Sequence, residues 1–331
     1  MQKIERRIDV TSAAALGGSM SMAVTLYLPD PARLAPRPVA IFACPGGGYS
    51  RRYFDMHFAG HEGYSEAEWH AAQGVIYVAI DHLGVGESSI PDLSRIDFQT
   101  LATTHDACVR TIAAELNNGT VIDDFPAVSP FRVGMGQSMG GGVTILAQGR
   151  FATFDAIAPC GVSAIHTALP QRDTAAFEHG VRRFEAVRDG RVTNHIEHDH
   201  AGVDYRYAFH WEDVPDEILH EDMKGGYPVR KTAPDFGSVT IPHCAVQMML
   251  PGAFAADAAR VQVPVLVANG ERDTCPQPKA EAAAYSTCDD ISIFIVPRMA
   301  HMHNFASTRA LLWQRLHAWS SMLAACSATD A

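Results

Sequence analysis

The sequence lacks the cysteine pairs that mark disulfide frameworks and zinc modules. Its seven cysteines stand singly, and none forms a C-x-x-C motif. Disulfide-rich secreted domains and structural zinc sites depend on such spacings. We therefore expect reduced, mostly buried cysteines in a cytoplasmic protein that needs no metal and no other cofactor.

Long apolar runs and positive charge are also scarce. No apolar stretch approaches the roughly 18 residues of a membrane span, and residues 1–7 are charged, unlike a signal peptide. Lys and Arg total 26 against 37 Asp and Glu, which gives a formal charge of −11. Nucleic acid and anionic membrane surfaces would repel such a chain. The sequence thus predicts a soluble, intracellular protein whose partner is a small molecule.

Most of the 331 residues alternate between short apolar runs and segments of helical spacing. The first two apolar runs read as antiparallel strands, and the later ones as buried parallel strands with helices on both faces of the sheet. The predicted strands are residues 5–11, 21–28, 39–44, 75–80, 132–135, 155–159, 263–268 and 291–296. The predicted helices are residues 67–73, 96–116, 143–148, 280–285 and 307–323.

The alternation stops between residues 163 and 258, a stretch rich in histidine, aspartate and aromatic residues. We predict a core of residues 1–162 and 259–331, with 163–258 as an inserted, mainly helical cap. Within it, His195, His198 and His200 have acidic neighbours, which favours a solvated loop over a metal site. Aromatic residues of the cap are expected to face substrate. A dimerisation surface, and hence a homodimer, is the alternative role for this segment.

The motif Gly136-Gln137-Ser138-Met139-Gly140 lies between a predicted strand and a predicted helix. This context is typical of a nucleophile elbow, in which a sharp turn lifts the serine hydroxyl clear of the sheet. The Met139 amide would then point toward negative charge developing beside Ser138. A glycine-rich turn with a serine N-cap is the plainer interpretation.

A second glycine cluster, Pro45-Gly46-Gly47-Gly48-Tyr49, follows the predicted strand 39–44. Alone it would be a flexible loop. Combined with Ser138 it predicts an oxyanion hole that uses amides near Gly47 and Gly48. Tyr49 is a candidate to line the pocket or to add a hydroxyl donor.

Taken together, five motifs at strand ends resemble those of the α/β-hydrolase superfamily across nearly all of the chain outside the cap. They are Pro45 to Gly48, Asp81 to Ser88, Gly136 to Gly140, Gly270 to Asp273 and the segment around His301. The resemblance implies an α/β-hydrolase fold and the chain order serine, acid, histidine. One departure is Cys44-Pro45, where the commoner esterase pattern has a histidine before the glycines.

The resemblance also implies a catalytic triad. Ser138 would be the nucleophile, His301 its general base, and Asp273 the carboxylate that orients the imidazole. His303 is the rival base, two residues further on, and a turn residue is the alternative role for Asp273.

A serine nucleophile predicts acyl transfer, unlike the aspartate of the superfamily's haloalkane dehalogenases and epoxide hydrolases. The substrate expected is a carboxylic ester or lactone of a medium-sized, fairly apolar molecule, aromatic macrolactones included. An amide, thioester or C–C bond, transfer to an alcohol, and a non-catalytic binding module remain the alternatives.

Overall fold

A central sheet of eight strands organises the computed structural model, which describes residues 1–173, 203–227 and 229–328. The strand order is β1-β2-β4-β3-β5-β6-β7-β8. The strands are β1 (Gln2–Asp9), β2 (Ser21–Leu28), β3 (Val39–Cys44), β4 (Ile76–Ile80), β5 (Phe131–Gln137), β6 (Ala156–Cys160), β7 (Val265–Gly270) and β8 (Ile291–Val296).

The pairing confirms the predicted fold class. β1 and β2 are antiparallel, β2 joins β4 antiparallel, and every pair from β4 to β8 is parallel. The parallel strands β3 to β7 are buried along their whole length except at Arg132 of β5, as the continuous apolar runs predicted. Their carboxyl ends meet at one edge of the sheet, so the loops that follow them converge there.

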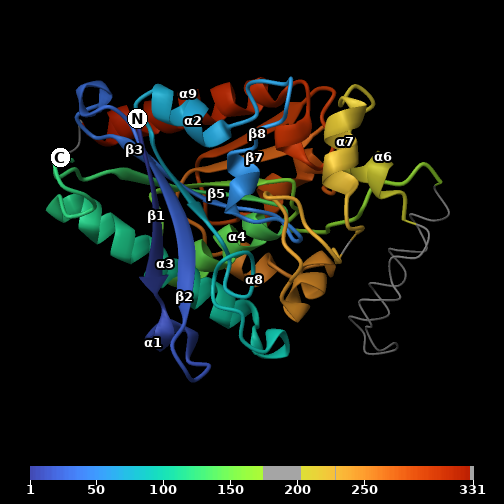
Figure 1. Ribbon diagram of the computed structural model, residues 1–331, viewed down its shortest axis with the longest axis horizontal. Coiled ribbons are helices and arrows are strands. Elements are labelled where there is room, and N and C mark those ends of the chain that lie inside the picture. The colour runs from blue at the N-terminus through green and yellow to red at the C-terminus, as the bar shows by residue number, and fades with distance from the viewer. Residues whose placement is uncertain (174–202, 228, 329–331) are drawn as a thin grey trace.

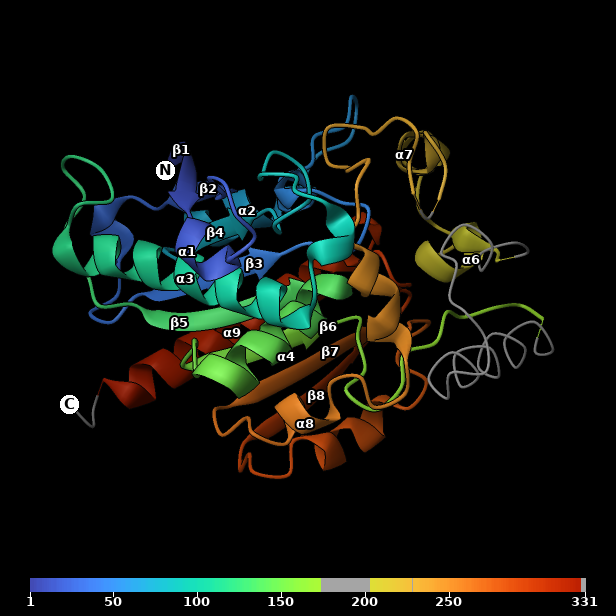
Figure 2. The ribbon, with the colours of Figure 1, turned by 90° about the horizontal axis from the view of Figure 1, so that it is seen from below.

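Helices cover both faces of the sheet (Figures 1 and 2). Figure 1 shows α2 and α9 above the sheet, and α3, α4 and α8 below it. The helices are α1 (Thr11–Ala14), α2 (Glu66–Ala72), α3 (Phe98–Asn118), α4 (Met139–Phe151), α6 (Tyr205–Phe209), α7 (Asp216–Met223), α8 (Ala255–Ala258) and α9 (Arg309–Ser327). The longest, α3, begins where the Asp97 carboxylate accepts the Thr100 N–H at 2.7 Å and ends at Gly119, whose φ is +67°.

Two hydrophobic cores result, one on each face. Ile112 of α3 and Val143 of α4 belong to the first, together with sheet residues such as Val78. Ala67 of α2 and Trp313 of α9 belong to the second. The sheet is therefore held between two apolar layers, which fixes the positions of its strand ends.

The 163–258 segment is described only at residues 163–173, 203–227 and 229–258. These parts hold the short helices α6, α7 and α8 and a 3-10 helix, His243–Met249, joined by irregular chain. In both views α6 and α7 lie beyond one end of the sheet (Figures 1 and 2). His195, His198 and His200 lie outside the described residues, and the division into core and cap stays a prediction.

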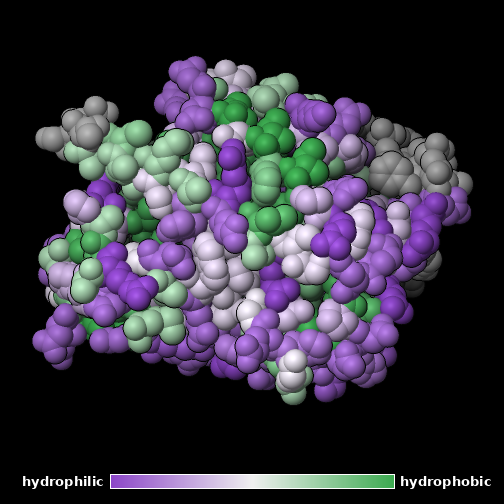
Figure 3. All heavy atoms as spheres, turned by 90° about the horizontal axis from the view of Figure 1, so that it is seen from above, coloured by the Kyte–Doolittle hydropathy of each residue, from purple (hydrophilic) through white to green (hydrophobic). Residues whose placement is uncertain are grey.

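The predicted elements differ from the structure mainly at their ends. β5 and α4 extend until only Ser138 separates them, and the helix predicted at 280–285 is a 3-10 helix, Pro278–Ala284. No helix in the described part of the chain has the length and apolar character needed to span a membrane. The face seen from above is mostly hydrophilic, with smaller groups of hydrophobic residues between the polar ones (Figure 3).

Candidate active site

Ser138 occupies a strained turn between β5 and α4. Its φ of +54° and ψ of −118° are rare for a residue with a side chain. A Cβ at Gly136 would lie 2.1 Å from the Gly140 carbonyl, and one at Gly140 would lie 2.1 Å from the Cys44 oxygen. Only glycine fits at either position, which is the physical reason for the motif.

The structure brings Ser138, His301 and Asp273 into hydrogen-bonding distance of one another in series. His301 Nε2 lies 2.9 Å from Ser138 Oγ, and His301 Nδ1 lies 2.7 Å from Asp273 Oδ1. Each residue follows a different parallel strand: Ser138 follows β5, Asp273 follows β7, and His301 follows β8. Converging strand ends thus assemble three side chains that are far apart in the sequence.

The Asp273 carboxylate is buried and accepts four hydrogen bonds. Thr274 N–H and His301 reach Oδ1, both at 2.7 Å. Gly270 N–H and His303 reach Oδ2, at 2.8 and 2.6 Å. Burial by itself would raise the pKa of Asp273, but the charge of His303 and hydrogen bonds from both histidines outweigh it and hold the pKa well below its usual range.

An ionised Asp273 determines which nitrogen of each histidine carries hydrogen. A carboxylate only accepts, so His301 donates from Nδ1 and its Nε2 presents a lone pair to the Ser138 hydroxyl. His303 donates from Nε2 to the other carboxylate oxygen. The structure therefore places His301 beside the serine and His303 on the far side of Asp273.

Two amides border the space beside Ser138. Met139 is the first residue of α4, and both Met139 and Gly47 line the cavity that contains Ser138. Neither N–H donates to an acceptor in the described residues. Gly48 has a different environment, since its carbonyl accepts the Ser238 N–H at 2.9 Å and it does not line this cavity.

Tyr49 does not lie where the sequence suggested. It is fully buried, and its hydroxyl lies 2.9 Å from both carboxylate oxygens of Asp222 on α7. The neighbouring aromatic rings of Tyr53 and Phe236 surround its own. Tyr49 therefore joins the glycine-rich loop 45–49 to the 163–258 segment instead of lining the cavity.

The cavity around Ser138 has a volume of about 630 Å³. Its lining is mainly apolar, and the described residues that line it include no Asp, Glu, Lys or Arg. The lining residues are Gly47, Leu93, Ser138, Met139, Gly161, Val162, Thr167, Leu169, Tyr205, Phe209, Tyr227, Val229, Val239, Thr240, Ile241, Pro242, His243, Ala245, Val246, Gln247, Met248, Met249, Thr274, His301 and Met302.

Three residues that support the site were not predicted. Gln137 Nε2 donates to the His301 carbonyl at 2.8 Å, and the Phe209 ring centroid lies 5.1 Å from that of His301. Gly161, at φ +60°, passes so close that a Cβ there would lie 3.2 Å from His301 Nδ1. Gly161, two residues after the end of the predicted strand 155–159, was the one usable sequence signal among them.

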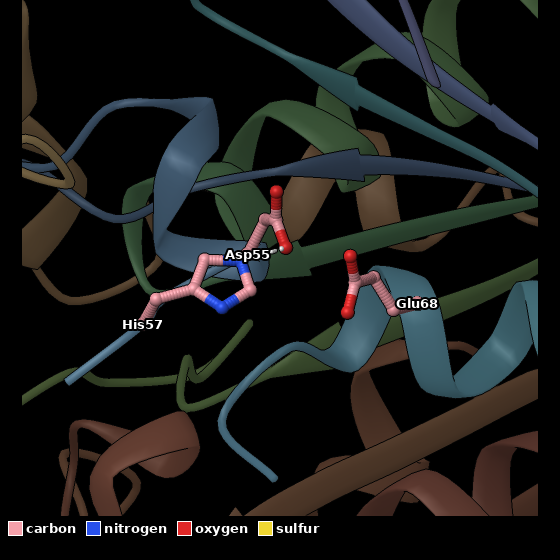
Figure 4. Close-up of side chains that lie close together, drawn as sticks. All are labelled: Asp55, His57 and Glu68. Atoms are coloured by element: carbon pink, nitrogen blue, oxygen red, sulfur yellow. Dashed lines mark hydrogen bonds and ion pairs between the residues drawn. The ribbon is translucent and has the colours of Figure 1, made fainter. Parts of the chain in front are cut away.

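Asp55, His57 and Glu68 form the cluster most suited to a metal ion, with ligand atoms within 4.8 Å of one another (Figure 4). Four donors already occupy the Asp55 oxygens: Lys3 Nζ at 2.5 Å, Ser65 Oγ at 2.6 Å, Tyr27 Oη at 2.7 Å and His57 Nε2 at 3.0 Å. A cation would have to displace them and would face the Lys3 ammonium. Asp55 is better explained as the anchor of the N-terminal strand.

The model of the alpha/beta hydrolase family matches residues 41–312. No curated protein sequence matches the chain. Similar solved structures include an esterase from Thermogutta terrifontis (15% identity, 96% of this chain and 99% of that chain, TM-score 0.59). A proline iminopeptidase from Mycobacterium smegmatis has 14% identity over 98% and 100% of the two chains, with a TM-score of 0.61.

A loop variant of a haloalkane dehalogenase from Bradyrhizobium elkanii matches over the full length of both chains at 15% identity, with a TM-score of 0.56. At these identities the structural likeness shows the fold alone. The family model, in contrast, spans most of the chain, including all the strand ends that carry Ser138, Asp273 and His301. The chain belongs to the alpha/beta hydrolase family.

Proposed function

We propose that the protein is a serine hydrolase that cleaves a carboxylic ester or lactone bond in a medium-sized, uncharged and fairly apolar molecule. One observation carries the proposal. An unbroken series of hydrogen bonds runs from Asp273 through His301 to Ser138, and Ser138 borders an apolar cavity.

In the first half of the reaction, Ser138 Oγ attacks the carbonyl carbon and its proton passes to His301 Nε2. The carbonyl oxygen becomes an oxyanion, which the N–H groups of Met139 and Gly47 stabilise. The intermediate collapses by breaking the bond to the alcohol oxygen, which takes the proton from His301. An acyl group then remains on Ser138.

In the second half, water attacks the acyl carbon while His301 Nε2 accepts one of its protons. Breaking the bond to Ser138 Oγ releases the acid, and the proton on His301 returns to the serine. Asp273 remains ionised throughout, since its lowered pKa keeps the carboxylate beside the imidazolium that forms in each half.

The cavity supports the choice of substrate. Its volume, about 630 Å³, falls among the roughly 300–1,000 Å³ of pockets that hold drug-sized ligands. An ionised substrate would lose its hydration among such residues without gaining an ion-pair partner from the described lining. An open ester would release an acid and an alcohol, whereas a lactone, including an aromatic macrolactone, would give one ring-opened hydroxy acid.

The test is acid release in a pH-stat with aliphatic esters, aryl esters and lactones of graded size. Ser138→Ala should remain folded and lose several orders of magnitude in rate, whereas Ser327→Ala, at the end of α9, should behave as the wild type. An aryl phosphonate should label the wild type at Ser138 with loss of its aryloxy group. Absence of both turnover and labelling in folded wild-type protein would overturn the proposal.

A further inference from the structure

Residues 45–49, here called the oxyanion loop, contain the turn that holds the Gly47 amide. The first and last peptide units of this turn are joined by one hydrogen bond. Gly46 C=O and Gly47 N–H belong to one planar unit, and Gly48 C=O and Tyr49 N–H belong to another. The Tyr49 N–H donates to the Gly46 oxygen at 3.2 Å. Gly48 has a φ of +82°, as the third residue of a type II turn requires. Whatever orients the Gly48 carbonyl therefore also orients the Gly47 N–H.

Glycine does not orient this turn by itself, because its backbone angles are less restricted than those of other residues. The restraint comes from the 163–258 segment. Ser238 N–H donates to the Gly48 oxygen at 2.9 Å, and Arg230 Nε donates to the same oxygen at 3.2 Å. Ser50 N–H donates to the Phe236 oxygen at 2.9 Å, which extends the contact along the loop.

Arg230 is in turn fixed by a buried carboxylate. Its Nη2 donates to Asp222 Oδ1 at 2.9 Å, and its Nη1 bonds the main-chain oxygens of Asp222 and Lys224. Both side chains are fully buried. The guanidinium thus uses separate nitrogens for Asp222 and for Gly48, a geometry that the ammonium of lysine does not reproduce.

Asp222 also accepts hydrogen bonds from the oxyanion loop and from other residues of the 163–258 segment. Tyr49 of the oxyanion loop reaches it, as do His210 Nε2 at 2.7 Å and Tyr227 at 2.6 Å. Burial alone would raise the pKa of Asp222, but the hydrogen bond and charge of His210, the charge of Arg230 and the hydrogen bond from Tyr227 lower it. Asp222 and Arg230 therefore form an ionised pair that is hydrogen-bonded to the turn at the Tyr49 hydroxyl and at the Gly48 oxygen, respectively.

We propose that Arg230, held by Asp222, is a positioning residue that sets the direction of the Gly47 N–H and so governs stabilisation of the oxyanion. The inference rests on the proposed serine-hydrolase function. It assigns to the 163–258 segment a part in the chemical step, in addition to enclosing the substrate.

The experiment compares Arg230→Lys with the wild type by three measurements: hydrolysis of p-nitrophenyl butyrate, inhibition by a phenylethyl trifluoromethyl ketone, and inhibition by the matching methyl ketone. Ser138 Oγ adds to the trifluoromethyl ketone carbon, its proton goes to His301, and the ketone oxygen becomes an oxyanion. The methyl ketone binds without this addition. Only the first inhibitor therefore reports on the oxyanion hole.

Arg230→Lys should lower kcat by about tenfold to a hundredfold, less than the roughly 100- to 1,000-fold that follows complete removal of an oxyanion donor. KM and methyl ketone affinity should stay within about twofold, while trifluoromethyl ketone affinity falls by the same factor as kcat. A purely structural role would weaken both ketones together. That result, or an unchanged kcat, would overturn the inference.

Arg150→Lys is the matched control. Arg150 also pairs with a carboxylate of the 163–258 segment, Asp257 on α8, at 2.9 Å, but has no contact with the oxyanion loop. Its kcat and ketone affinities should equal those of the wild type. If Arg230→Lys does not melt cooperatively, Asp222→Asn carries the same comparison, because it weakens the hold on Arg230 with little change of shape.

The wild type and the two variants together distinguish failure of the serine-hydrolase proposal from failure of the proposed role of Arg230. Without turnover or preference for the trifluoromethyl ketone in the wild type, the serine-hydrolase function fails. With both present and kcat and ketone affinities unchanged in the two variants, only the role of Arg230 fails.

Discussion

Removing each of the two histidines beside Asp273 should have very different effects on catalysis. His301→Ala deletes the only described imidazole nitrogen within hydrogen-bonding distance of Ser138 Oγ. Because the members of a triad act as a unit, we expect kcat to fall by about four orders of magnitude or more. His303→Ala leaves the contact between His301 and Ser138 intact.

The magnitude for His303→Ala follows from the four donors around Asp273. Three of them remain, and Oδ2 keeps the Gly270 N–H at 2.8 Å. A hydrogen bond to a charged group contributes about 1.5–3 kcal/mol, so the free energy of unfolding should fall by that amount. If about half of the larger value is lost from the stabilisation of the transition state, kcat should fall by about tenfold.

Initial rates on p-nitrophenyl butyrate give kcat for both variants, and urea denaturation gives their stability. Ser138→Ala supplies the background rate. A folded His303→Ala protein without activity, beside an active His301→Ala protein, would refute the assignment of His301 as the base. Equal loss in two folded variants would refute the argument that three donors suffice to hold Asp273.

Two further predictions concern Glu66, a buried carboxyl group on α2, and Gly161, which lies against the His301 ring. Burial raises the pKa of Glu66 from 4.5 to about 7, so between these values the unfolded chain releases a proton that the folded protein keeps. Stability should be greatest below the unfolded pKa and should fall by about 3 kcal/mol as pH rises through 7. The urea midpoint of the wild type should fall between pH 5 and pH 8, and that of Glu66→Gln should fall less. An equal decrease in the two proteins would contradict the prediction. Gly161→Ala should lower kcat at least about tenfold, because φ +60° disfavours a side chain and the new Cβ would press on His301. Wild-type kcat in a folded Gly161→Ala protein would contradict this, and a melting curve would verify folding.

The central sheet was largely predictable because strands β2 to β7 are buried almost throughout. Residues 21–28, 39–44 and 291–296 match β2, β3 and β8 residue for residue. In a parallel sheet the strand ends meet at one edge, so motifs that follow separate strands are expected to meet. The structure brings Ser138, Asp273 and His301 together at that edge as this reasoning implies.

The residues by which the 163–258 segment contacts the site could not be predicted in the same way. Residues such as Arg230 and Asp222 lie in irregular chain or on a short helix, where no periodicity indicates which side chain is buried. Tyr49 illustrates the difficulty, because its partner Asp222 is 173 residues away in sequence. The choice between His301 and His303 likewise depends on backbone geometry after β8, which the two-residue spacing does not specify.

The chain order of the site has a consequence for biosynthesis. His301 follows Ser138 by 163 residues, so at about 5–20 residues per second the ribosome would add it roughly 8 to 33 seconds later. During that interval a nascent chain holds Ser138, the proposed nucleophile, without His301, its proposed base. Among the described strands, β8, which precedes His301, pairs with β7 alone and forms the border of the sheet. Synthesis of β8 would therefore cover the exposed border of β7 and, within the next few residues, supply the imidazole proposed to activate Ser138.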